Sequence, residues 1–310
     1  MEPRLSVVIP TRDCLEYLPS ALASVRAQAI DRLQLVVVDD GSTDGTGEYL
    51  AAQAARDPDL TIVARAGGAG VAAARNAGLA VARAPIVGFL DADDVWRPGT
   101  IAARLAAHEA DPGLVLSFAD YDHVAPDGTD LGTCFAFWPR FARFLAGRRG
   151  LVPLGSRALA LLYAENVVGT STVLARRDAL AAEAGFSAEF RLAEDWDLWL
   201  RLARRGGVAC WAEIGATYLV RPGSLSRDRP GLIACMRRIA RRHGEAVLRT
   251  APSAWLACRS RIAAAEAEHA RIVGRRPAAL LQHLLALVLA PSRRLAWETA
   301  ADGARLLRLR

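Results

Sequence analysis

Ile86-Val87-Gly88-Phe89-Leu90-Asp91-Ala92-Asp93-Asp94 is an apolar run that ends in three carboxylates. A short, uninterrupted run of this kind is typical of a strand buried on both faces. Similar runs precede it, with helical spacing between them: strands at 5–10, 33–39 and 60–63, and helices at 17–29, 46–56 and 70–83. This alternation predicts an α/β fold with a mostly parallel, Rossmann-like sheet flanked by helices and joined by right-handed crossovers.

Polar residues stand where these strands end. Pro10-Thr11, Asp39-Asp40 and the carboxylates from Asp91 to Asp94 each follow a predicted strand. Ligands of open α/β sheets bind beyond the carboxyl ends of the strands. The three strand ends therefore predict one binding edge.

The second half of the chain is less regular. It predicts short elements: strands at 115–119, 167–174, 208–212 and 217–220, and helices at 177–184 and 194–205. Residues 127–157 are expected to form a loop or a mobile lid. From residue 232 the pattern is helical, with breaks at Pro252, Gly274, Pro277 and Pro291. We predict a catalytic domain at 1–231, with a nucleotide-binding half (1–110) and an acceptor-binding half (111–231), and a basic helical extension at 232–310.

Charge divides the chain in the same place. All 39 positive side chains are arginines, and 15 of them lie in residues 232–310 beside five acidic residues. Residues 1–231 carry 24 arginines and 28 acidic residues, so this part is acidic overall. An acidic body argues against a nucleic-acid partner. The arginine-rich extension predicts either a peripheral contact with an anionic membrane or a helical cap with a solvated basic face.

Cysteine usage and hydropathy bear on location. The five cysteines are scattered without a pairing or metal-binding pattern, which is typical of reduced thiols. No signal-peptide pattern opens the sequence. The longest apolar run, 278–290, is shorter than the roughly 20 residues that a membrane-spanning helix needs. These features predict a cytoplasmic protein. If the extension contacts a membrane and is not a helical cap, that contact would be at the inner face of the plasma membrane.

The carboxylates of Asp91, Asp93 and Asp94 suit a divalent cation. Mg²⁺ or Mn²⁺ prefers oxygen ligands and relieves the repulsion between crowded carboxylates. The alternative is an acidic turn in which Asp94 is the N-cap of the next helix. The position of the cluster at the same edge as Asp39-Asp40 favours the metal site.

Two further residues have open roles. Arg75, in the helix before the acidic strand, can contact a nucleotide or form a structural ion pair with the aspartates. Asp195 stands near a predicted helix start between Trp196 and Trp199. Partial desolvation there would raise its pKa, as suits a general base, whereas a simple favourable charge at a helix N-terminus is the alternative.

Five motifs in this order resemble the family 2 glycosyltransferases, which have the A-type glycosyltransferase fold. Together they cover roughly the first 70% of the chain. Four are the segments 6–11, 37–44, 74–78 and 88–94, and the fifth combines Gly185-Phe186 with the later Glu194-Asp195. Each motif is weak alone, but the five in order are specific.

The resemblance implies roles for single residues. Pro10, Thr11, Asp39, Asp40, Arg75 and Ala92 would line the nucleotide-sugar pocket. Asp93 would ligate the cation, with Asp91 as a second ligand nearer the ribose, and Asp195 would deprotonate the acceptor hydroxyl. Two residues depart from the family pattern. Arg12 replaces an aromatic residue and would contact either the base or the diphosphate, and Arg221 replaces a histidine and suits the diphosphate.

The implied activity is an inverting transfer of a sugar from a nucleotide diphosphate sugar, most often a UDP-sugar, to a glycan or lipid-linked acceptor in bacterial cell-envelope polysaccharide assembly. Two alternatives stay open. A catalytically silent nucleotide-sugar-binding or scaffold protein would not need Asp195. A sugar nucleotidyltransferase would carry a Gly-rich basic loop after the first strand, where this chain has Pro10-Thr11-Arg12-Asp13.

Overall fold

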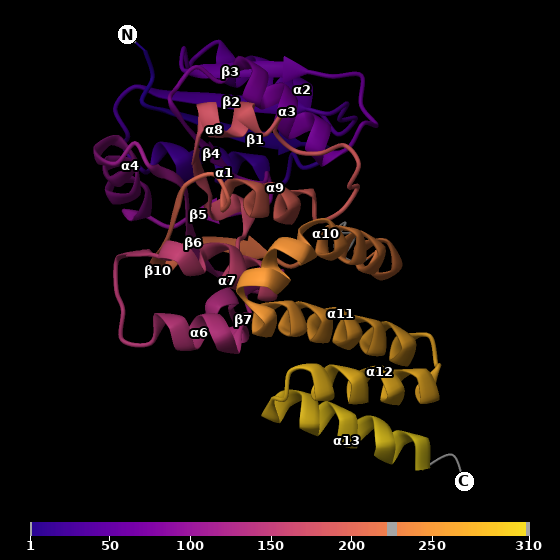
Figure 1. The fold of residues 1–310 in the computed structure, drawn as a ribbon. Coiled ribbons are helices and arrows are strands. Elements are labelled where there is room, and N and C mark those ends of the chain that lie inside the picture. Colours follow the sequence, from indigo (N-terminus) through magenta and orange to yellow (C-terminus); the bar gives the residue numbers. More distant parts are fainter. Residues whose placement is uncertain (1, 222–227, 308–310) are drawn as a thin grey trace. The chain divides into compact units, whose positions relative to one another are not determined.

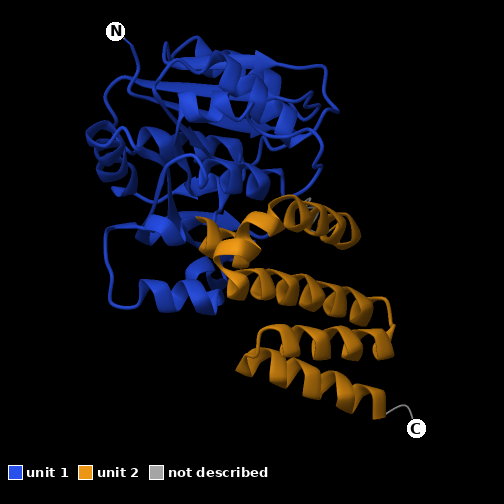
Figure 2. Ribbon diagram, in the orientation of Figure 1, with its two compact units in different colours: residues 1–158, 167–222 blue, residues 159–166, 223–310 orange. Residues whose placement is uncertain are grey.

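A computed structural model describes residues 2–221 and 228–307 of the chain. Contacts within it divide the chain into two compact units, shown in Figure 2. Unit 1 comprises residues 1–158 and 167–222, and unit 2 comprises residues 159–166 and 223–310. The predicted boundary at residue 231 and the division at residue 110 stay predictions.

Unit 1 is built on a mixed sheet (Figure 1). Its strand order is β3 (Leu60–Ala64), β2 (Leu33–Asp39), β1 (Leu5–Thr11), β4 (Ile86–Phe89), β9 (Leu174–Arg176), β6 (Leu114–Val124), β10 (Gly207–Leu219) and β5 (Val95–Trp96). The first four strands in this order are parallel, and antiparallel pairing begins where β9 joins β4. Two short strands pair outside this order, β7 (Asp130–Thr133) with β6 and β8 (Leu151–Pro153) with β10. The predicted α/β sheet flanked by helices is confirmed.

Helices cover both faces of the parallel strands, which explains why these strands are apolar throughout. On one face, α1 (Leu18–Arg26) packs its buried Leu18, Leu22 and Val25 into the core cluster of β1 and β2. On the other face, α3 (Val71–Val81) lies so close that a Cβ on Gly78 would meet Val8 at 2.4 Å. Among the other helices of this unit are α2 (Thr46–Ala54), α4 (Thr100–Ala110), α8 (Arg177–Ala182) and α9 (Glu194–Leu202).

Several local predictions were wrong. The predicted strand at 167–174 is a 3₁₀ turn at Thr170–Thr172 followed by β9. The hydroxyl of Thr172 donates to the carbonyl of Gly169, and such local bonds compete with a strand ladder. The predicted strands at 208–212 and 217–220 are one bulged strand, β10. Asp94 is not a helix N-cap, because β5 follows it and α4 begins after Gly99.

Residues 127–157 contain more structure than the predicted loop or lid. Besides β7 and β8, they form α5 (Cys134–Phe137) and α6 (Pro139–Leu145). Phe135 and Phe141 are buried against Phe118 of β6, so these aromatic residues belong to the core. The elements are too short to produce a recognisable period in the sequence.

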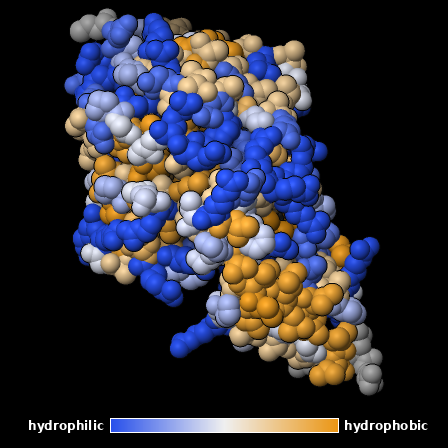
Figure 3. All heavy atoms as spheres, viewed as in Figure 1, coloured by the Kyte–Doolittle hydropathy of each residue, from blue (hydrophilic) through white to orange (hydrophobic). Residues whose placement is uncertain are grey.

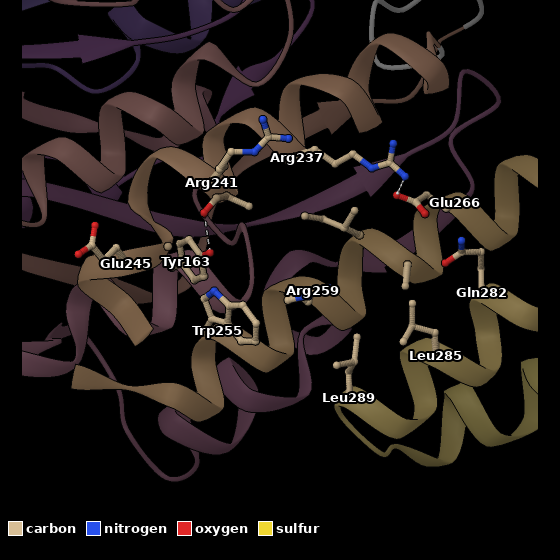
Figure 4. A pocket seen from close by; sticks show the side chains of 14 residues that line it. Tyr163, Arg237, Arg241, Glu245, Trp255, Arg259, Glu266, Gln282, Leu285 and Leu289 are labelled. Carbon is tan, nitrogen blue, oxygen red and sulfur yellow. Dashed lines mark hydrogen bonds and ion pairs between the residues drawn. The ribbon is translucent and has the colours of Figure 1, made fainter. Parts of the chain in front are cut away.

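Unit 2 is helical, as predicted. It contains most of α7 (Ala158–Ala164) and four longer helices: α10 (Arg229–Thr250), α11 (Pro252–Ile272), α12 (Arg276–Leu289) and α13 (Arg293–Leu307). A pocket of about 530 Å³ lies between α10, α11 and α12 (Figure 4). Beside it, Tyr163 donates to the carbonyl of Ala240 at 2.8 Å, and Arg237 pairs with Glu266 at 2.6 Å. None of the predicted site residues lines this pocket.

Candidate active site

The ends of β1 and β2 lie side by side, because Thr11 and Asp39 are register partners. The amide of Asp40 donates to the carbonyl of Thr11 at 2.9 Å, and Asp39 accepts from the amide of Ser42 at 2.9 Å. The chain then turns at Gly41, where φ is +79° and a Cβ would meet the Cα of Gly67 at 2.9 Å. Only glycine fits this turn without strain. Pro10, Thr11 and Asp39 therefore reach one edge, as their positions predict.

Asp40 and Arg12 differ in exposure at this edge. Asp40 is buried and accepts a hydrogen bond from Nε of Arg65 at 3.0 Å. Arg12 is exposed, and its Nε lies 3.9 Å from the carboxylate of Asp13. Arg65 was not among the predicted residues, and nothing in its sequence context distinguishes it from other arginines.

The three carboxylates after β4 have different hydrogen-bond and ion-pair partners. The amide of Asp94 donates to the carbonyl of Asp91 at 3.1 Å and closes a turn that also contains the buried Ala92. Asp91 pairs with Arg75 at 2.7 Å, and Asp93 pairs with Arg221 at 2.5 Å. Each of these two carboxylates is about a quarter exposed. Two of the three are thus available at the surface of the turn.

Asp94 is the buried member of this cluster. It accepts from the hydroxyl of Ser171 at 2.5 Å and from the amide of Leu219 at 3.2 Å. Burial raises its pKa well above the ordinary value, and the charges of Asp91 and Asp93 add to this effect. Asp94 therefore holds the turn to the 3₁₀ segment and to β10, instead of capping a helix.

Arg75 connects the acidic turn to the second half of unit 1. Its guanidinium is buried, donates to Asp91 at 2.7 Å and to Glu194 at 2.6 Å, and lies 5.3 Å from the ring centre of Phe186. Burial opposes its charge, but Asp91 and Glu194 hold its pKa above the ordinary value. The neighbouring Asn76 exchanges two hydrogen bonds with the backbone of Phe186, at 2.7 and 2.9 Å. Together these contacts fix α3 against the start of α9.

Asp195 lies in the first turn of α9. Its carboxylate accepts from the hydroxyl of Thr170 at 2.8 Å and from the amide of Trp196 at 2.7 Å. Burial raises the pKa of Asp195, and the guanidinium of Arg75 opposes that rise. Asp91 is a nearby negative charge that raises it further. The same chemistry acts on Glu194, whose pKa burial raises to about 7 against the attraction of Arg75.

Arg221 belongs to the same rim. Besides Asp93, its guanidinium contacts the sulfur of Cys14 at 3.2 Å and lies 5.4 Å from the ring centre of Tyr17. The rest of the Pro-Gly-Ser-like segment, residues 222–226, lies outside the described residues. Arg221 thus pairs with a carboxylate that the resemblance assigns to the cation.

A cation would need ligands in addition to those that the described residues provide. Within residues 2–221 and 228–307, no group of three or more His, Cys, Asp or Glu side chains is arranged to hold a metal ion. Asp91 and Asp93 each use one oxygen for an arginine, which leaves the second oxygen of each. Mg²⁺ is commonly held by one or two carboxylates together with substrate phosphates and water. These residues therefore fit a cation that arrives with a diphosphate.

Two hydroxyl residues in the site were missed from the sequence. Thr170 holds Asp195 and Ser171 holds Asp94, and both belong to the segment predicted as a strand. A signal was present, because three consecutive hydroxyl residues interrupt an otherwise apolar run. Buried hydroxyls need hydrogen-bond partners, and carboxylates provide them.

Comparisons with known proteins find a family match for part of the chain and similar folds among solved structures. Residues 6–157 match the family model described as Glycosyl transferase family 2. The chain is 30% identical over 141 residues to the chondroitin synthase of Pasteurella multocida (strain Pm70), which is 46% of this chain and 14% of that protein. The chain therefore spans a small part of this relative.

Two solved structures have similar folds. One is S. aureus TarS 1–349 in complex with UDP-GlcNAc, with a TM-score of 0.57, 17% identity, and coverage of 97% of this chain and 89% of that one. The other is the mannosyltransferase PcManGT from Pyrobaculum calidifontis in complex with GDP-Man and Mn²⁺, with a TM-score of 0.59, 24% identity, and coverage of 98% and 85%. At this identity the likeness shows the fold, and it confirms the predicted A-type glycosyltransferase fold.

Proposed function

Residues 6–157 are a family 2 glycosyltransferase domain, and from this premise we propose that the chain transfers a sugar from a nucleotide diphosphate sugar to an acceptor hydroxyl with inversion. One observation carries the proposal. Arg75 joins Asp91, on the acidic turn after β4, to Glu194, which directly precedes Asp195. This pairing supports a site in which carboxylates would lie on the leaving-group side and a base on the acceptor side.

The donor would lie over the ends of β1, β2 and β4. Asp39 and Asp40 can accept from base N–H groups or ribose hydroxyls, with Pro10 and Thr11 beside them and Asp91 toward the ribose. Ala92 is buried and packs in the core cluster, so its role in the pocket stays a prediction. Arg12 is exposed and Arg221 partly exposed, so both can approach a diphosphate.

Asp93 and Asp91 would hold Mg²⁺ or Mn²⁺ together with the diphosphate oxygens. When bound, the cation neutralises the charge that develops on the departing diphosphate. The Mn²⁺ in the PcManGT complex supports this assignment, and so does the remaining oxygen on each carboxylate.

Asp195 would act as the general base. Its carboxylate takes the proton of the acceptor hydroxyl while the hydroxyl oxygen forms a bond to the anomeric carbon. The bond from that carbon to the diphosphate breaks on the opposite side, and its electron pair leaves with the diphosphate. A carboxylate with a raised pKa accepts a proton more readily than an ordinary one, and Thr170 keeps its oxygens oriented.

The substrates are proposed by class. UDP-GlcNAc in the TarS complex and GDP-Man in the PcManGT complex favour a UDP- or GDP-sugar donor. The chondroitin synthase relative favours a glycan acceptor in bacterial polysaccharide assembly. A lipid-linked glycan would present the same hydroxyl to Asp195.

Replacing the base separates catalysis from binding. Asp195→Asn should lower the rate of sugar transfer by about 10²–10⁴-fold, the usual contribution of a general base. Affinity for the nucleotide sugar, measured by calorimetry, should change little. Asp178→Asn is the matched control, because Asp178 also lies in the first turn of a helix and accepts from the next amide at 2.7 Å, but is exposed and outside the site.

Wild-type turnover in the Asp195→Asn variant would contradict the base assignment. A wild-type protein that binds a nucleotide sugar without transferring it, over a panel of glycan acceptors, would favour the silent binding protein instead.

A further inference from the structure

The helix α12 buries small or polar residues and exposes large apolar ones. Its buried positions are Ala279, His283 and Ala286, which are small or polar. Leu281, Leu284, Leu285 and Val288, which we name the leucine face, are exposed by 66%, 44%, 42% and 78%. Their spacing of three and four residues puts them on one stripe of the helix. Helices of globular proteins normally bury such a stripe.

Polar contacts fix this orientation of α12. His283 forms a hydrogen bond through Nδ1 with Asp302 of α13 at 2.7 Å, and its Nε2 lies 3.4 Å from Glu298. On the other side, the hydroxyl of Ser260 in α11 donates to the carbonyl of Ala286 at 2.7 Å. These contacts hold the side of α12 that carries His283 and Ala286 inward. The opposite side, the leucine face, is therefore turned outward.

Other large apolar side chains of unit 2 are exposed besides the leucine face. Figure 3 shows hydrophobic residues gathered over the region of α12. Trp297 of α13 is 70% exposed, and at the end of α11 Ile272 and Val273 are exposed as well. Leu285 also points into the pocket between α10, α11 and α12 (Figure 4). Large exposed apolar patches rimmed by polar residues mark interaction sites.

Arginines stand at both ends of the leucine face. Arg275 and Arg276 lie at the start of α12, and Arg293 and Arg294 follow its end. Residues 276–289 contain no acidic residue. Among the ion pairs of the described residues, none involves Arg275 or Arg293. This arrangement of cations around an apolar stripe matches phosphate headgroups above an acyl layer.

We propose that the leucine face of α12, with Trp297 and the flanking arginines, binds the surface of an anionic lipid bilayer. Of the helices in the described part of the chain, none is long and apolar enough to cross a membrane. A helix of this length, about 21 Å, suits an orientation parallel to the surface. The stripe would enter the boundary of the acyl chains, and each arginine near the surface would add attraction to anionic lipids.

Charge disfavours a second copy of the chain as the occupant. Arginines lie at both ends of the stripe, so two copies packed face to face would oppose arginine to arginine in either direction. Like charges placed together across an interface are costly. An anionic bilayer meets the same arginines with opposite charge.

Flotation of the full chain with vesicles tests the proposal. Vesicles of phosphatidylcholine with 30% phosphatidylglycerol, roughly the charge of an anionic bacterial surface, are compared with pure phosphatidylcholine. We expect binding to the anionic vesicles to be at least about tenfold stronger, and to weaken as salt is raised.

Two sets of variants separate the apolar and charged contributions. The triple variant Leu281→Gln, Leu284→Gln and Val288→Gln should reduce binding by about tenfold or more, because it removes the inserted side chains. Leu131→Gln, at an exposed leucine of β7, is its matched control. Arg275→Gln with Arg293→Gln should weaken binding several-fold and flatten the salt dependence, and Arg56→Gln with Arg149→Gln, at exposed arginines of unit 1, is the control.

The proposal is overturned if the triple variant floats as well as the wild type. It is also overturned if the wild type does not float and light scattering shows a dimer that is absent in the triple variant. The leucine face would then join two copies of the chain. The positions changed are exposed, so circular dichroism is expected to show unaltered helix content. The arginine variants test the proposal independently if the triple variant unfolds. Vesicle binding does not depend on transfer activity, so its failure leaves the proposed function untouched.

Discussion

Arg75 illustrates what spacing along a chain can and cannot define. The sequence placed it before the acidic strand and left two roles open, a nucleotide contact and a structural ion pair. The structure pairs it with Asp91, 16 positions away, and with Glu194, 119 positions away. Only the first partner could be expected from local order, because the second depends on how α9 packs. The same limit explains why Thr170 and Ser171 were missed.

The pH dependence of transfer follows from the environment of Asp195. Its pKa is raised by burial, so the base becomes protonated, and the rate falls, at a pH above that expected for an ordinary aspartate. Thr170 donates to the charged form and lowers the pKa. Thr170→Val should therefore move the acidic limb of the kcat/KM profile to higher pH.

The neighbouring Thr172 supplies the control for this shift. Its hydroxyl donates to the carbonyl of Gly169 and not to a carboxylate, so Thr172→Val should leave the acidic limb in place. If Thr170→Val and Thr172→Val give the same profile as the wild type, Asp195 is not the group that titrates in the acidic limb.

At the scale of elements, prediction succeeded where one physical cause dominated. The strands β1, β2 and β4 are buried on both faces, so an uninterrupted apolar run was sufficient to identify them. Prediction from the sequence failed where several weak local interactions competed. In residues 127–157 each helix or strand is short, and in 167–174 hydroxyl side chains bond to the backbone and replace the expected strand.

The packing of α3 on the sheet is expected to tolerate no added methyl group at Gly78. A Cβ there would lie 2.4 Å from Val8 and 3.2 Å from Val38. Overpacking of this kind costs about 1–3 kcal/mol, more than the roughly 0.5–1 kcal/mol that alanine adds in a helix. Gly78→Ala should lower the urea-unfolding midpoint, and it should also lower transfer because α3 carries Arg75.

A second glycine distinguishes crowding from helix propensity. Gly303 in α13 has no atom within 4 Å of the position of an added Cβ, so Gly303→Ala should leave the midpoint unchanged or raise it. Val8→Ala combined with Gly78→Ala should recover part of the loss. Equal effects of the two glycine substitutions would contradict the steric explanation.

At the scale of the whole molecule, the sequence predicted an acidic body and a basic helical extension, and the helices of unit 2 are present. The sequence could not predict which side of α12 faces outward. That helix is apolar at most positions, so periodicity did not single out a buried face. The deciding contact joins His283 to Asp302, 19 positions later, and is visible only when both helices are placed.

The stability of the full chain should report donor binding. A ligand that binds the native state raises the free energy of unfolding by about 2.7 kcal/mol when present at 100 times its Kd. UDP or GDP with Mn²⁺ should therefore raise the melting temperature more than either nucleotide alone, and the nucleotide with the larger shift identifies the donor class. Asp93→Asn should remove the part that depends on Mn²⁺ and keep most of the part due to the nucleotide. Asp31→Asn, at an exposed aspartate outside the rim, should behave as the wild type. An undiminished Mn²⁺ effect in Asp93→Asn would exclude Asp93 as a ligand and leave Asp91 with the phosphate oxygens as the site of the cation.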